Sequence, residues 1–147
     1  MFIAALIAGL HYLGIMILAA TLLLEWMTLR GKITREAIER LARTDQIYGM
    51  AAILILATGL LRLTEAYGRG PAFYMQNGVF HLKVTLFLLV GIISIAPTMR
   101  FLRWRRAMLK DNALPEASAV AGTRKLVLAE LHILFLIPFL AALMVRI

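Results

Sequence analysis

The stretch FIAALIAGLHYLGIMILAATLLL, residues 2–24, decides the fold of this chain. It holds 23 residues without a single Asp, Glu, Lys or Arg. About twenty helical residues, each adding about 1.5 Å, cross a hydrocarbon core of roughly 30 Å. We therefore predict a membrane-spanning helix. A cleaved signal peptide is less consistent with this stretch, which has no basic segment before it, is long, and is followed by no clear small-residue cleavage site.

Three further apolar runs follow, at residues 47–63, 79–96 and 126–145. The run at residues 79–96, the third of the four predicted spans, stops at Pro97. Proline lacks the N–H for a helical hydrogen bond and disfavours helix in the residue before it. The pattern predicts an all-α, integral membrane four-helix bundle that forms a single domain over residues 1–147.

The composition excludes an ordinary soluble domain. Of 147 residues, 62% are hydrophobic and 16% are charged, whereas a soluble domain of this size needs a mostly polar exterior. Cysteine is absent, which excludes disulfides, a thiolate nucleophile and metal or haem attachment through Cys.

The chain carries 16 basic and 8 acidic residues, a net charge of +8. Such an excess in a soluble protein suggests nucleic acid. Here, twelve of the sixteen basic residues fall in the first and third connections between the predicted spans. The positive-inside rule places these connections in the cytoplasm and both termini outside. We therefore expect a lipid bilayer as partner and no nucleic acid.

The connections themselves have predicted structure. Thr34 is a suitable N-cap for a helix that runs on into the second span. Phe101, Leu102 and Trp104 among four arginines predict an interfacial segment that contacts anionic headgroups. The composition of residues 111–122 predicts a flexible linker.

An ionisable residue inside a membrane span costs free energy, so its default interpretation is a functional role. Helical rise places His11 about 12 Å, Lys83 about 6 Å and His132 about 20 Å from the outer face, so His11 and Lys83 lie at compatible levels. His81 is expected at the interface, and Glu130 is expected close to the cytoplasmic rim.

His11 suits an axial haem ligand or a proton carrier, because neutral imidazole binds iron and titrates near physiological pH. The alternative is a histidine that only packs between helices. Lys83 could neutralise an anionic group such as a propionate, or could extend its ammonium to the outer headgroups. His132 is a second-choice ligand for which packing is favoured. At the rim, Asp45 is expected at a helix N-terminus, and Glu25 is expected to pair with Arg43 or Arg103.

Three strings resemble an uncharacterised family of small four-span bacterial membrane proteins, which implies a multi-pass protein of the bacterial inner membrane. They are TDQIYGMAAILILATGLLR (44–62), FYMQNGVFHLKVTLF (73–87) and GIISIAPTMRFLRW (91–104).

More distantly, a histidine in the first span and FHLKVTLFLL (80–89) in the third resemble HemJ-type protoporphyrinogen oxidases, which are four-helix membrane proteins that bind haem b. The resemblance implies a tetrapyrrole ligand and catalytic roles for His11 and Lys83, with His11 ligating the haem iron. The HemJ pattern has an arginine, a tyrosine and a histidine in the second half of the first helix, where this chain reads MILAATLLLEWMTLR (16–30).

Two functions remain open from the sequence. The first is a HemJ-like haem b redox protein, in which His11 is the axial ligand and Lys83 lies near a propionate or a substrate carboxylate. The second is a non-enzymatic membrane protein, either an assembly partner or a small transporter subunit. A transporter subunit of this size requires a homo-oligomer.

Overall fold

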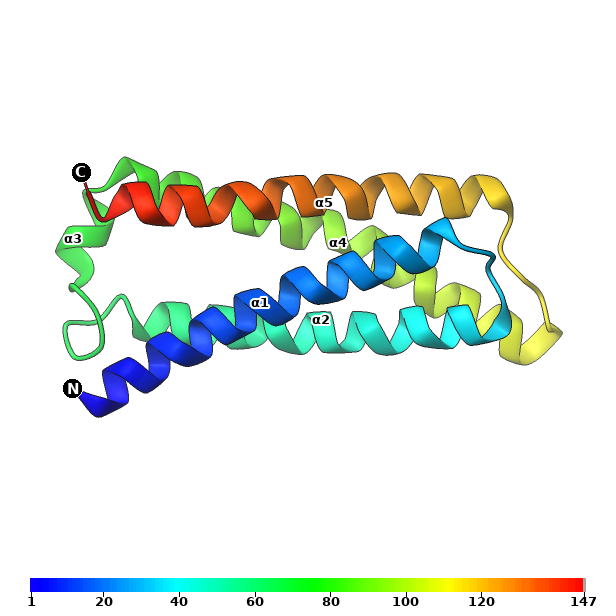
Figure 1. Cartoon of the computed structure of the whole chain (residues 1–147), viewed down its shortest axis with the longest axis horizontal. Helices are drawn as coiled ribbons and strands as arrows, with labels where there is room; N and C mark the ends of the chain where they lie inside the picture. Colours follow the sequence, from blue (N-terminus) through cyan, green and yellow to red (C-terminus); the bar gives the residue numbers. More distant parts are fainter. Residues whose placement is uncertain (147) are drawn as a thin grey trace.

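The computed structural model describes residues 1–146 and is all-helical over this range apart from turns and connections. Its helices are α1 (Phe2–Arg30), α2 (Arg35–Leu61), α3 (Pro71–Met75), α4 (Gly78–Asp111) and α5 (Ala117–Met144). The four long helices run up and down along one axis (Figure 1). Both termini and α3 lie at one end, which we call the terminal end. The α1–α2 and α4–α5 connections lie at the other, which we call the basic end.

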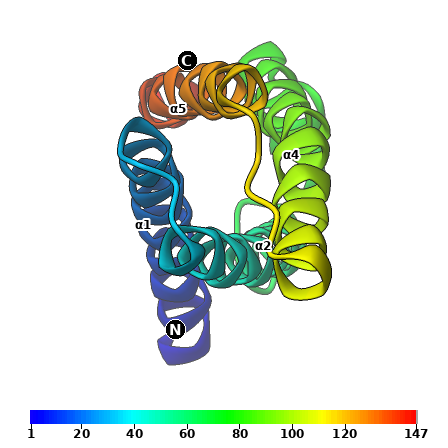
Figure 2. The ribbon, with the colours of Figure 1, turned by 90° about the vertical axis from the view of Figure 1, so that its right-hand side faces the viewer.

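The four long helices form a ring in the order α1, α2, α4, α5, as the view along the bundle shows (Figure 2). One cluster of buried apolar side chains joins the helices, with Leu18, Ile55, Phe101 and Val127 as representatives of α1, α2, α4 and α5. α1 packs closely against α2 at Gly14, where a Cβ atom would lie 2.9 Å from Cγ1 of Ile55. A larger residue at this position would force the Ile55 side chain to shift.

The outer surface of the bundle is apolar. Large hydrophobic side chains are more than 60% exposed on every long helix, for example Phe2, Ile53, Ile92 and Phe139. All four helices are long and apolar enough to cross a membrane. An apolar exterior of this extent is typical of a surface that faces lipid. The prediction of a four-helix membrane bundle is confirmed.

The helices extend well beyond the apolar runs. As predicted, α2 begins before its span, at Arg35, and the Thr34 hydroxyl oxygen accepts a hydrogen bond of 3.2 Å from the Ala37 N–H. The prediction that the third span stops at Pro97 is wrong, because α4 continues through this residue to Asp111. Pro97 is buried against the bundle, and proline is tolerated inside membrane-spanning helices.

Two predictions about the third connection are also wrong. A linker over residues 111–122 is not observed, because α5 already begins at Ala117 and only residues 112–116 connect the helices. Asn112 ends α4 in the left-handed conformation (φ 51°), which Asn tolerates better than most residues. Phe101 does not contact headgroups, since it is 1% exposed and belongs to the core.

Candidate functional site

A cavity of about 570 Å³ opens between the terminal-end halves of the four long helices. We call it the four-helix cavity. Its walls are mostly apolar. The α5 side contributes only apolar residues, and the polar side chains come from the other helices. The polar and aromatic lining residues are His11 and Tyr12 from α1, Arg62 at the end of α2, Tyr74 from α3, and Phe80, Lys83 and Phe87 from α4.

His11 is half-buried in this cavity and is held by Thr58 of α2. Its Nδ1 lies 2.9 Å from the Thr58 hydroxyl oxygen. That hydroxyl donates its own proton to the Leu54 carbonyl at 2.6 Å, so its oxygen is left to accept from Nδ1–H. In this network the neutral imidazole carries its free lone pair on Nε2.

The imidazole ring lies against Gly59. A Cβ atom at this position would lie 3.4 Å from Cε1 of His11. A histidine that ligates a metal usually donates its other ring N–H to a neighbouring acceptor, which fixes the tautomer and the ring orientation. His11 has this arrangement, with Thr58 as the acceptor.

Two cationic side chains share the cavity with His11. Lys83 and Arg62 are both half-buried and line the cavity together with His11. Each also contacts an aromatic ring, with Lys83 Nζ 5.5 Å from the centre of Phe80 and the Arg62 guanidinium 5.3 Å from the centre of Tyr12. Neither forms an ion pair within residues 1–146, where the one ion pair joins Arg105 to Glu39. The cavity therefore presents two positive charges without a counter-charge.

His132 is not brought to this cavity. It lies on the exposed face of α5, with Nδ1 2.7 Å from the Leu128 carbonyl of its own helix. His81 is exposed as well, and its Nε2 lies 2.9 Å from the Met75 carbonyl. Of the three histidines, His11 alone lines the four-helix cavity.

A second polar group is buried nearer the basic end, at the centre of the ring. We call it the buried carboxyl cluster, and it consists of Glu25, Asp45 and Glu130. Glu25 is 2% exposed and Glu130 is fully buried, and each has one carboxyl oxygen without a hydrogen-bond partner within the described residues. Tyr48 donates a hydrogen bond of 3.3 Å to Glu130.

Thr98 of α4 completes this cluster by donating a hydrogen bond of 2.8 Å to Asp45. The prediction that Glu25 pairs with Arg43 or Arg103 is wrong, since Glu25 has no ion pair in residues 1–146. Glu130 is fully buried within the bundle, and α5 begins nine residues before the apolar run that contains it. The three carboxylates of the cluster come from three different helices, α1, α2 and α5.

The described residues contain no group of three or more His, Cys, Asp or Glu side chains that could hold a metal ion. A haem needs fewer protein ligands, because its macrocycle supplies four nitrogen donors and the protein adds one or two axial ligands. The cavity fits this group: it offers one oriented imidazole, apolar and aromatic walls, and two cations for the propionates. Its volume lies within the range of cofactor sites.

The fold and its lipid-facing surface define a multi-pass membrane protein with four candidate spans. The chain belongs to the family described as "Predicted membrane protein (DUF2214)", whose model matches residues 3–146. No curated protein and no solved structure matches the chain.

Proposed function

We propose that the protein binds haem b in the four-helix cavity, with His11 Nε2 as the axial ligand. The observation that carries this proposal is the His11–Thr58 hydrogen bond, which leaves Nε2 as the free donor atom of an imidazole inside a largely apolar cavity. When bound, haem supplies one-electron redox chemistry. The HemJ resemblance supports the same cofactor.

Arg62 and Lys83 orient the haem in this proposal by pairing with its propionates. Two unpaired cations inside a membrane protein are costly unless an anion neutralises them, and a haem b brings two carboxylates. Lys83 is better suited to this role than to iron ligation, because a lysine ligates only when it has lost its proton.

The enzymatic part of the proposal is the oxidation of protoporphyrinogen to protoporphyrin, in which a bound haem would pass the electrons removed from the substrate to an acceptor of the respiratory chain. This substrate has the same carboxylate side chains as haem, so Lys83 and Arg62 can hold either molecule at the cavity. In this role Lys83 and His11 contact the substrate or the cofactor directly and are the catalytic residues.

The test has two readouts. The protein is purified in mild detergent from haem-replete bacteria, and its haem content and its conversion of protoporphyrinogen to fluorescent porphyrin are measured. The proposal predicts bound haem and light-independent porphyrin formation above a no-protein control. Bound haem without porphyrin formation would contradict the proposed oxidase activity and would still support haem binding. A colourless preparation whose native mass exceeds the monomer would favour the assembly partner or transporter subunit.

A further inference from the structure

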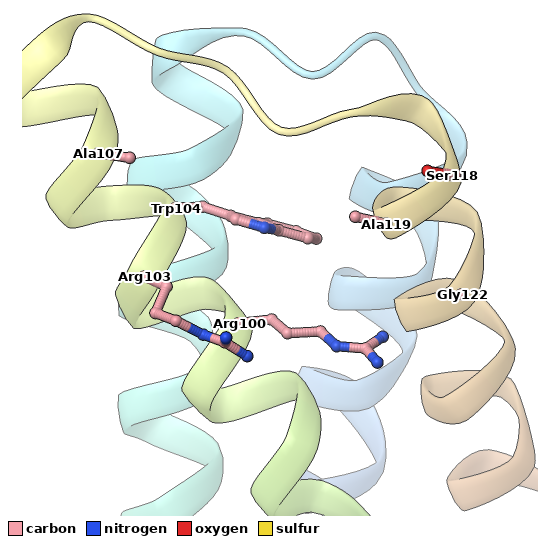
Figure 3. A pocket seen from close by; sticks show the side chains of 7 residues that line it. All are labelled: Arg100, Arg103, Trp104, Ala107, Ser118, Ala119 and Gly122. Atoms are coloured by element: carbon pink, nitrogen blue, oxygen red, sulfur yellow. The ribbon is translucent and has the colours of Figure 1, made fainter.

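A second cavity lies at the basic end, between the last third of α4 and the first turns of α5. It has a volume of about 420 Å³, and we call it the α4–α5 pocket. Figure 3 shows Arg100 and Trp104 extending from α4 across the space toward α5, with Arg103 beside them. The opposite wall is made by Ser118, Ala119 and Gly122 of α5.

Both guanidinium groups of the pocket lack a counter-charge. Arg100 donates one hydrogen bond, of 3.0 Å, to the Thr123 hydroxyl, and Arg103 donates one, of 3.4 Å, to the Met99 carbonyl. Neither forms an ion pair in the part of the chain that the structure describes, and the lining contains no acidic residue. Because a guanidinium has five N–H donors, most donors of both groups remain free.

The first turn of α5 borders the same space. Its N-cap, Glu116, makes no side-chain hydrogen bond to the first turn, and Ser118 and Ala119 of this turn line the pocket. The backbone N–H groups at a helix N-terminus and the helix dipole both favour an anion. Gly122 lies beside the Arg100 guanidinium, since a Cβ atom there would be in van der Waals contact with Nη1, at 3.6 Å.

We propose that the α4–α5 pocket binds a phosphate group through Arg100, Arg103 and the first turn of α5. Two guanidinium groups and a helix N-terminus match the oxygens of a phosphate, which Arg binds in a bidentate manner. Basic pockets between membrane helices bind the headgroups of anionic lipids. This site is separate from the four-helix cavity and does not depend on haem.

The phosphate can belong to a phospholipid or be free in solution. The surface of α4 below the pocket suits acyl chains, because Arg103 continues a row of exposed apolar residues spaced three or four positions apart. These residues are Ile92, Ile95 and Met99, which are 66%, 61% and 50% exposed. A phospholipid held by Arg103 can lay its chains along this row.

The experiment compares thermal unfolding midpoints of the full chain in neutral detergent after addition of three probes. These are phosphatidylglycerol, phosphatidylcholine and inorganic phosphate. Stabilisation by phosphatidylglycerol, and not by phosphatidylcholine, supports the site and identifies a lipid headgroup as its source. Stabilisation by inorganic phosphate to the same extent supports the site and identifies free phosphate.

The variants decide whether the pocket is responsible. The double variant Arg100→Gln/Arg103→Gln should bind the effective probe at least about tenfold more weakly, since two charge-assisted contacts are lost. The matched control, Arg106→Gln/Lys110→Gln, removes two charges from exposed positions of the same helix and should bind like the wild type.

A charge-conserving variant covers the case in which the Gln variant does not fold. Arg100→Lys/Arg103→Lys keeps both charges and loses the bidentate geometry, so it should fold and bind several-fold more weakly. Equal affinity in the wild type and the Lys variant, or an equal response to all three probes, would overturn the proposal.

Discussion

The imidazole of His11 on α1 and the hydroxyl of Thr58 on α2 lie 2.9 Å apart, at the wall of the four-helix cavity. This hydrogen bond joins two neighbouring helices and fixes which ring nitrogen is free. Thr58 is 4% exposed, so the bond is shielded from water on the Thr58 side. It therefore links α1 to α2 at this level of the bundle and directs Nε2 of His11 away from Thr58.

Replacement of Thr58 tests this control. Thr58→Val keeps the shape of the side chain and removes the acceptor for His11, so we expect haem affinity to fall roughly 10- to 100-fold, as for other partners of metal-ligating histidines. Thr58→Ser retains the hydroxyl and should keep most of the haem. Haem titration of the apoprotein measures both affinities. Equal affinity in Thr58→Val and the wild type would show that the bond does not orient a ligand.

The two cations of the four-helix cavity give a second prediction. Arg62→Gln and Lys83→Gln should each weaken haem retention, because each removes one partner of a propionate. Arg69→Gln is the control, since Arg69 lies at the same end of the bundle, contacts Phe73 and is absent from the cavity lining. Haem per protein after gel filtration measures the effect. Retention that falls equally in all three variants would indicate a general effect of charge.

The buried carboxyl cluster gives a prediction about stability. Tyr48→Phe removes the one hydrogen-bond partner that Glu130 has in residues 1–146, so we expect a loss of about 1–3 kcal/mol in the free energy of unfolding. In a Glu130→Leu background the same change should cost much less, because no buried carboxyl is left unpaired. Denaturation of the four proteins in detergent measures the coupling. Additive effects of the two changes would contradict the assigned hydrogen bond.

The side of the membrane on which each end of the bundle lies is a fourth prediction. Because the chain has no cysteine, single cysteines report accessibility without background. Lys32→Cys and Ala113→Cys, at the basic end, should react with a membrane-impermeant maleimide only after the cells are opened. Glu65→Cys, in the α2–α3 connection, should react in intact spheroplasts. The reverse pattern would contradict the orientation that the basic residues predict.

The four spans could be predicted from the sequence because length and apolarity alone decide whether a helix crosses a bilayer. Helical rise also placed His11 and Lys83 at compatible levels, and the structure has both in one cavity. The ends of the helices could not be found in this way. An apolar run marks the hydrocarbon core, whereas α2 and α5 begin 12 and 9 residues before their runs and α4 ends 15 residues after its run.

The rotation of each helix about its own axis could not be predicted from the sequence either. A helix that is apolar on all sides gives no periodic signal for the side that faces its neighbours, so depth alone could not show that His132 faces outward. For the same reason the sequence could not show that the side chains of Glu25 and Asp45 are buried within the bundle. Arg62 was missed as a member of the site because it lies at the very end of the second apolar run, and only the fold brings it to the same cavity as Lys83.

The most direct test of the account replaces the proposed ligand and restores it from solution. His11→Gly should be purified without a haem Soret band, and added imidazole should restore haem binding by occupying the space of the lost side chain. His132→Gly, which removes an exposed histidine, should bind haem like the wild type. A Soret band in His11→Gly equal to that of the wild type, without imidazole, would contradict the assignment of His11 as the axial ligand.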